Sequence, residues 1–274
     1  MNPPKRTTDV SFDEAAPYYD ETRGLSPEAS AATTELFVAE FERSDRLLEV
    51  GVGTGLLALP LIERGFRVHG VDLSHPMILR LREAVRPPAS PGLIIADATR
   101  LPFRSGSFGG VFIRHVLHLI PDWQRALTEV TRVVQPGGRF LVSITDYTGL
   151  YREVQDRFLA EAGGLPLSVG LSPDDHGSLL RAMSLLGSRG RRLPTVRGRR
   201  TLTLEGFLEH IEAGYYTWTW STTEGQRTEG VRSLRAWLHR RFGNLDRPVE
   251  PEYAVEWWAF DLPHPRPGSR LAPA

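Results

Sequence analysis

A glycine-rich turn that follows a short apolar run is the feature of this sequence with the clearest chemical meaning. Residues 47–55 read Leu-Leu-Glu-Val-Gly-Val-Gly-Thr-Gly, a pattern that predicts a strand, a tight turn and then a helix. Glycines let the backbone turn sharply and let a ligand lie against it, and the start of the helix offers unpaired N–H groups. A dinucleotide-binding turn reads Gly-x-Gly-x-x-Gly, whereas the sixth position counted from Gly51 is Leu56. Glu49 stands just before the turn and disfavours a pyrophosphate, so the pattern favours a ligand with positive charge, such as an amino-acid moiety and a sulfonium.

Two more carboxylates follow the next two apolar runs and suit the other groups of such a ligand. Asp72 ends the run 68–72, where its carboxylate can accept hydrogen bonds from both hydroxyls of a ribose. Asp97 follows the run 93–96, where it can accept from an adenine amino group while the N–H of Ala98 meets a ring nitrogen. Each acid by itself also fits a helix N-cap. Three acids at the ends of successive runs are better explained by one ligand site along the edge of a parallel sheet.

Two histidines, His115 and His118, come just after a fourth apolar run at 111–113. The reacting atom of a second substrate would lie at this edge of the sheet. His118 is our candidate catalytic residue, since an imidazole there can remove a proton from a hydroxyl group, with a packing or capping role as the alternative. His115 is expected to form part of the wall of the site. We predict no metal, because no third ligand is evident beyond Asp122.

The elements that must position these residues alternate along residues 26–147. Short apolar runs, which predict buried strands, lie at 47–50, 68–71, 93–96, 111–113 and 140–144. Amphipathic segments predict helices at 56–64, 76–85 and 123–134, and a further helix is predicted to begin at Ser26 and Pro27. This alternation predicts an α/β fold with a doubly wound, mostly parallel sheet of about seven strands, helices on both faces and the site at the carboxyl ends of the strands.

The pattern changes after Tyr147, and we predict a helical cap inserted near the carboxyl end. Tyr216, Trp218 and Trp220 would share one face of an extended segment, where they wall an acceptor or pack in a core. Residues 148–193 are predicted to be helical with glycine breaks, 207–213 and 231–242 to be helices, and 197–204 and 253–260 to be strands. We therefore divide the chain into an amino-terminal segment (1–25), a Rossmann-like core (26–147), a helical cap or substrate region (148–245) and a final strand with a tail (246–274).

Composition argues against several classes of function. The 33 basic and 33 acidic residues cancel, so no overall charge favours nucleic acid or an anionic membrane. The absence of cysteine removes disulfides, thiolate metal sites and cysteine nucleophiles. Residues 1–10 do not have the apolar core of a secretory signal, and no run approaches the roughly 20 apolar residues of a membrane span. We expect a cytoplasmic location.

Taken together, these motifs resemble those of class I (Rossmann-like) S-adenosylmethionine-dependent methyltransferases. The most similar group is that of the ubiquinone- and menaquinone-biosynthesis methyltransferases (methyltransferase type 11). The resemblance covers roughly residues 10 to 147 and rests on the segments 12–20, 49–55, 70–77, 96–98, 101–103, 108–111, 115–119 and 129–140. One departure is Arg114, since that position is often small or polar in this group.

The resemblance implies which residues line the cofactor site. They are Glu49, Gly51, Asp72, Asp97, Ala98, the backbone of Arg114, and Met77, which would pack beneath the adenine or else serve as a core residue. We add Gly53, Thr54 and Leu73 from the same turns. Tyr19 and Arg23 in the amino-terminal segment would close over the bound cofactor or pack on the surface.

The resemblance further implies an enzyme that transfers the methyl group of S-adenosyl-L-methionine to O, N or C of a small-molecule acceptor and releases S-adenosyl-L-homocysteine. The amino-terminal segment and the cap would act as its gate. We expect neither nucleic acid nor a membrane as a partner. A non-catalytic adenosylmethionine-binding protein is one alternative, and a nicotinamide-dependent oxidoreductase, which Leu56 disfavours, is another.

Overall fold

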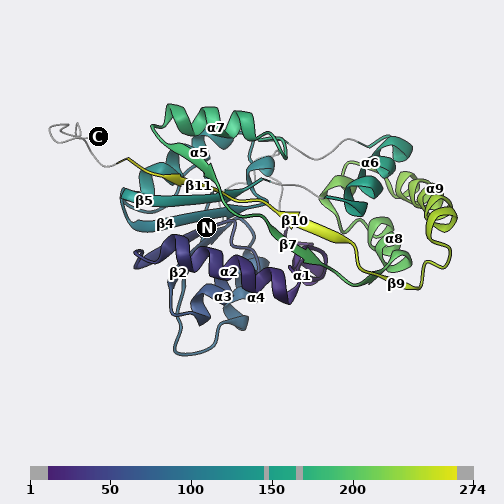
Figure 1. The fold of residues 1–274 in the computed structure, drawn as a ribbon, viewed down its shortest axis with the longest axis horizontal. Coiled ribbons are helices and arrows are strands. Elements are labelled where there is room, and N and C mark those ends of the chain that lie inside the picture. Colours follow the sequence, from purple (N-terminus) through teal and green to yellow (C-terminus); the bar gives the residue numbers. More distant parts are fainter. Residues whose placement is uncertain (1–11, 145–147, 165–168, 264–274) are drawn as a thin grey trace.

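A seven-stranded sheet forms the centre of the protein (Figure 1). The computed structural model describes residues 12–144, 148–164 and 169–263. The strand order is β3-β2-β1-β4-β5-β11-β6, and within this sheet only β11 runs in the opposite direction to the other described strands. The strands are β1 (Arg46–Val50), β2 (Arg67–Asp72), β3 (Gly92–Ile95), β4 (Phe108–Arg114), β5 (Val134–Ser143), β6 (Arg189–Arg192) and β11 (Trp258–Asp261). The predicted doubly wound, mostly parallel sheet is confirmed.

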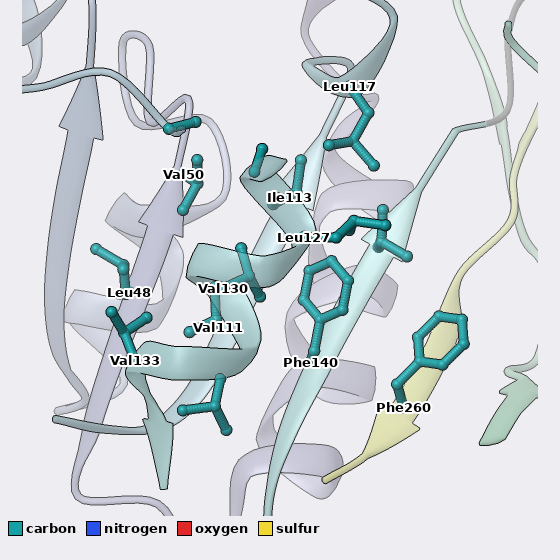
Figure 2. Packing of buried hydrophobic residues seen from close by; sticks show 14 of the residues in the cluster. Leu48, Val50, Val111, Ile113, Leu117, Leu127, Val130, Val133, Phe140 and Phe260 are labelled. Carbon is teal, nitrogen blue, oxygen red and sulfur yellow. The ribbon is translucent and has the colours of Figure 1, made fainter. Parts of the chain in front are cut away.

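The central strands are buried on both faces, which explains why runs such as 111–113 in β4 and 140–142 in β5 are continuously apolar. Val111 and Phe140 belong to the core on one face, together with Val130 of α5 (Trp123–Val133) (Figure 2). The helix α7 (His176–Leu185) covers the same core. Their neighbours in sequence, Phe112 and Leu141, belong to the core on the other face, because successive side chains of a strand point to opposite sides. That second face is covered by α2 (Pro27–Phe41), α3 (Ala58–Glu63) and α4 (His75–Ala84) (Figure 1).

A separate group of helices forms a cap at one end of the sheet, at the right of Figure 1. It consists of α6 (Leu150–Ala162), α8 (Leu204–Glu212) and α9 (Glu224–Phe242), which pack around Phe158, Phe207, Trp218 and Leu234. Two antiparallel strand pairs lead from the sheet to the cap. They are β7 (Val196–Arg199) with β10 (Glu252–Val255), and β8 (Leu202–Thr203) with β9 (Pro248–Val249).

The amino-terminal segment folds into the short helices η1 (Ala16–Tyr18) and α1 (Tyr19–Arg23), which lie between the core and the cap. The ring of Tyr18 stacks on that of Tyr215 in the cap, with 3.8 Å between centroids. The guanidinium of Arg200 donates to the backbone carbonyls of Glu21, Thr22 and Gly24. Contacts with the cap and with the strand pairs that lead to it therefore hold this segment in place.

Some predicted elements differ from the structure. The single strand predicted at 253–260 is two strands, because after Val255 the chain leaves β7 and pairs with β5 instead. The predicted extended segment at 216–220 is wrong, since Thr217–Thr219 form a 3₁₀ turn (η3) in which Tyr216 and Trp218 stack on each other. The range 148–245, predicted as the cap, also contains α7 and β6, which belong to the sheet layer. The division of the chain at those boundaries stays a prediction.

Two further observations concern the predicted organisation. The tail beyond residue 263 and residues 145–147 at the predicted boundary lie outside the described residues. Within the part of the chain that the structure describes, no helix has the length and apolar composition needed to cross a membrane.

Candidate functional site

The glycine turn connects the end of β1 to α3 and requires glycine for steric reasons. Gly51, Gly53 and Gly55 all have positive φ, at 75°, 53° and 90°. A Cβ atom on Gly51 would lie 2.2 Å from Cγ2 of Val116, and one on Gly55 would lie 2.3 Å from the side chain of Leu81. The turn is thus packed closely on its inner side, and its backbone is left as the surface that faces the edge of the sheet.

Asp72 anchors this turn to the end of β2. One carboxylate oxygen accepts a hydrogen bond from the N–H of Gly53 at 2.8 Å, and the other accepts from the N–H of Ser74 at 2.9 Å. Burial raises the pKa of Asp72, although these backbone hydrogen bonds act in the opposite direction. Each oxygen has a second lone pair, so the carboxylate can hold the turn and still accept from a ligand hydroxyl.

Glu49 is a buried carboxylate that forms no ion pair with any described residue. Its residue is 4% exposed, and its Oε2 atom has no hydrogen-bond partner among the described residues. Burial raises the pKa of Glu49 well above its usual value, and the negative charge of Asp72 adds to this effect, while Arg114 opposes it. A buried acceptor of this kind is suited to a ligand ammonium group.

The third acid, Asp97, differs from the other two. It is exposed, and its Oδ1 accepts from both the N–H and the hydroxyl of Thr99, at 2.7 and 2.8 Å. It therefore stabilises its own turn, and because no helix begins there, the alternative of a helix N-cap is wrong for Asp97. Its second carboxylate oxygen takes no part in these two hydrogen bonds.

A cavity of about 200 Å³, which we call the cofactor cavity, lies along this edge of the sheet. Eight of the predicted site residues line it, namely Tyr19, Gly51, Gly53, Asp72, Leu73, Met77, Asp97 and Ala98. Met77 also packs against Ala15 and Ala16 of the amino-terminal segment, as the core alternative predicts, and its place beneath an adenine stays a prediction.

Five predicted site residues do not line the cofactor cavity. Glu49 is buried in β1, just before the turn. Thr54 donates a hydrogen bond to Asp20 and so ties the turn to α1. Arg23, Arg114 and the catalytic candidate His118 line a second cavity of about 120 Å³, which we call the acceptor cavity.

The two cavities meet at a shared wall formed by Phe12, Tyr19, His115 and Val116. Several lining residues of the acceptor cavity carry no local motif that would identify them in the sequence. They are Ser143 at the end of β5, Tyr151 and Gln155 on α6, and Tyr253 on β10. Trp218 also lines it, and only its aromatic character made it a candidate from the sequence.

Both histidines are held in the neutral state. Burial, together with the nearby charge of Arg23, lowers the pKa of His118 to about 4. Burial, Arg114 and other basic neighbours lower the pKa of His115 well below its usual value, and the backbone of His115 has φ of 55°, which is uncommon for a residue other than glycine. At neutral pH the imidazole of His118 is therefore able to accept a proton.

The burial of His118 predicts a loss of stability in acid. Its pKa is about 4 in the folded protein and 6.5 ordinarily, so the unfolded chain binds the proton more readily and stability falls as the pH drops from 6.5 towards 4. Between pH 7 and pH 5 we expect the wild type to lose about 2 kcal/mol more of its unfolding free energy than His118→Asn does. Urea denaturation at both pH values measures this difference. Equal losses would contradict the prediction, since His115 is present in both proteins and its contribution cancels.

Comparisons with known proteins match the part of the chain that contains the glycine turn and the three acids. Residues 48–142 match the family model described as a methyltransferase domain. The chain is 32% identical over 165 residues to a demethylmenaquinone methyltransferase of Renibacterium salmoninarum, an alignment that covers 58% of this chain and 68% of that protein. It is 31% identical over 139 residues to a bifunctional biotin-biosynthesis protein of Cellvibrio japonicus, covering 51% of this chain but 27% of that protein. Several other curated relatives are also matched over less than two thirds of their length.

Among solved structures, a putative type II methyltransferase from Anaeromyxobacter dehalogenans has the same fold. The TM-score is 0.61 at 23% identity, with 84% of this chain and 97% of that chain covered. This likeness concerns the fold alone, and it includes most of the chain that lies outside the region matched by the family model.

Proposed function

Because the chain belongs to the family of class I S-adenosylmethionine-dependent methyltransferases, we propose that it methylates a small molecule bound in the acceptor cavity. S-adenosylmethionine is the cofactor of this family. The observation that carries the proposal is the shared wall of Phe12, Tyr19, His115 and Val116, because it brings a cofactor cavity and an acceptor cavity together at the carboxyl edge of the sheet.

The residues present fit this cofactor. The buried carboxylate of Glu49 would pair with the ammonium group of the methionine moiety, Asp72 would accept from the ribose hydroxyls, and Asp97 with Ala98 would meet the adenine. Gly51 and Gly53 leave the backbone of the turn uncovered for this ligand. Bound there, S-adenosylmethionine supplies an electrophilic methyl group and a neutral sulfide leaving group.

The chain's own residues then have three tasks in our proposal. The shared wall aligns the two reactants and excludes water between them. His118, neutral above pH 4, takes the proton from a hydroxyl acceptor as the new bond forms. The amino-terminal segment, tied to the turn by Thr54 and Asp20 and to the cap by Tyr18 and Tyr215, closes both cavities.

Calorimetric titration of the purified chain with S-adenosylmethionine, S-adenosylhomocysteine and NADH tests the proposal. We expect binding of the two adenosyl ligands at about micromolar affinity and none of NADH. Binding of NADH alone, or of no ligand, would overturn the proposal. Tight cofactor binding without turnover on any small molecule would favour the alternative of a non-catalytic binding protein, which the comparisons do not favour.

Two substitutions locate the site within the same experiment. Asp72→Ala and Asp97→Ala should each weaken binding of S-adenosylhomocysteine about tenfold or more, and Asp72→Ala should do so more strongly because it also releases the N–H of Gly53. Asp175→Ala is the matched control, since Asp175 caps α7 through the N–H of Ser178 and lines neither cavity. Unchanged affinity in both folded site variants would mean that the ligand binds elsewhere.

A further inference from the structure

The two cavities carry opposite charges. The cofactor cavity is lined by three aspartates, Asp72, Asp97 and Asp122. The acceptor cavity is lined by three arginines, Arg23, Arg114 and Arg200, and none of its described lining residues is acidic. A cavity wall of low dielectric strengthens the field of such charges, so the acceptor side favours a negative ligand.

Arg114 is the arginine whose charge is available to a ligand. It ends β4 beside the shared wall, and its guanidinium donates no hydrogen bond to any described residue, with Nε fully buried. The charge of Glu49 raises the pKa of Arg114, against the lowering caused by burial, but the two side chains form no ion pair within the described part of the chain. In the proposed function Glu49 pairs with the ammonium group of the cofactor and does not neutralise Arg114. The buried positive charge of Arg114 would therefore be stabilised by an anionic group of a ligand in the acceptor cavity.

The other two arginines have different tasks. The guanidinium of Arg200 donates hydrogen bonds to the carbonyls of Glu21, Thr22 and Gly24, so it holds the amino-terminal segment in place. Arg23 lies over the ring of Tyr216, 5.0 Å from its centroid, and borders the same cavity. Its field reaches His118 and His115, whose lowered pKa values follow first from burial and then from such positive neighbours.

The rest of the cavity wall suits an aromatic body with oxygen acceptors. Five aromatic side chains line it, namely Phe12, Tyr19, Tyr151, Trp218 and Tyr253. The indole N–H of Trp218 is buried and has no hydrogen-bond partner among the described residues, and the same holds for the hydroxyl oxygen of Ser143. A buried donor without a partner costs free energy that a ligand oxygen can recover.

We propose that the methyl acceptor is an aromatic carboxylic acid whose carboxylate binds Arg114, with Arg23 adding to the positive field, while its ring lies among the aromatic side chains. The inference rests on the proposed function. A guanidinium is the side-chain group best matched to a carboxylate, because it offers two parallel N–H donors with a permanent charge. The aromatic wall gives the ring favourable edge and face contacts.

Matched acid and amide probes test the charge requirement directly. With the protein saturated by S-adenosylhomocysteine, we would titrate 3- and 4-hydroxybenzoate and the corresponding hydroxybenzamides, which have the same size but no charge. At least one acid should bind about tenfold or more tightly than its amide. In Arg114→Met this preference should fall to about twofold or less, whereas Arg114→Lys should keep part of it because the charge remains.

The control is Arg232→Met, which removes an exposed arginine on α9 that pairs with Glu229 and lines neither cavity. It should leave the acid-to-amide ratio unchanged. The ratio is measured within one protein, so a general loss of folding in a variant does not imitate the expected result. Equal binding of acid and amide, binding of neither, or an unchanged ratio in Arg114→Met would overturn the inference. If S-adenosylhomocysteine itself does not bind, the proposed function fails instead.

Discussion

Glu49→Gln should stabilise the ligand-free protein at neutral pH and weaken the binding of S-adenosylhomocysteine by about 10- to 100-fold. The carboxyl of Glu49 is buried and its pKa lies well above the usual value, so the folded state takes up the proton more readily than the unfolded chain does. Stability from this group is therefore present at low pH and is lost as the pH rises through the folded-state pKa. Glutamine does not ionise and avoids that loss, but it offers a ligand ammonium group no charge.

Thermal unfolding between pH 5 and pH 8 and calorimetric titration measure the two effects of Glu49→Gln. The matched control is Glu129→Gln, a second buried glutamate whose pKa is lowered, chiefly by its hydrogen bonds from Arg132. Glu129 stabilises the fold above its unfolded pKa, so its loss should destabilise the protein at neutral pH and leave cofactor affinity unchanged. If the two glutamines shift stability in the same direction, the assignment of Glu49 to a ligand is wrong.

Gly51→Ala should destabilise the fold by about 3 kcal/mol or more and abolish measurable binding of S-adenosylhomocysteine. Two costs add in this variant. The backbone has φ of 75°, which L side chains rarely adopt, and the new Cβ would lie 2.2 Å from Cγ2 of Val116. Because Val116 belongs to the wall that the two cavities share, its displacement would alter both of them.

Urea denaturation and calorimetry measure the effect of Gly51→Ala against Gly65→Ala. Gly65 has a similar φ of 88°, but nothing lies within 4 Å of its added Cβ. That control should cost only about 1 kcal/mol and leave cofactor binding intact. Adding Val116→Ala to Gly51→Ala should recover part of the stability, since it removes the clashing methyl group. Equal costs at Gly51 and Gly65 would show that the contact with Val116 is unimportant.

The sheet and the cofactor motifs were predictable from the sequence because each depends on residues that are near one another in the chain. Continuous apolar runs such as 111–113 mark strands that are buried on both faces, whatever their neighbours are. The turn at Gly51 to Gly55 depends on local backbone conformations that only glycine adopts without strain. A parallel sheet then brings the strand ends together, so Glu49, Asp72 and Asp97 share one edge.

The elements that were mispredicted depend on partners far away in the chain. The run 253–260 is apolar throughout, yet it divides where Val255 leaves β7 and Trp258 joins β5. The segment 216–220 alternates like a strand, yet the packing of Trp218 against Phe158 in the cap accommodates a 3₁₀ turn instead. Tertiary contacts override local patterns at such places.

The sequence by itself determined the Rossmann-like sheet, the glycine turn and the family of the chain, since all three follow from patterns among residues that are close in sequence. Only the tertiary structure decided where the acceptor cavity lies, because its wall comes from α1, β4, β5, α6 and β10, which are distant in the chain. It also decided that Arg23 faces that cavity rather than the cofactor cavity, and that His118 is neutral. The packing of α1 determines where Arg23 lies, and burial with the charge of Arg23 lowers the pKa of His118. Neither effect is encoded in the spacing of residues along the chain.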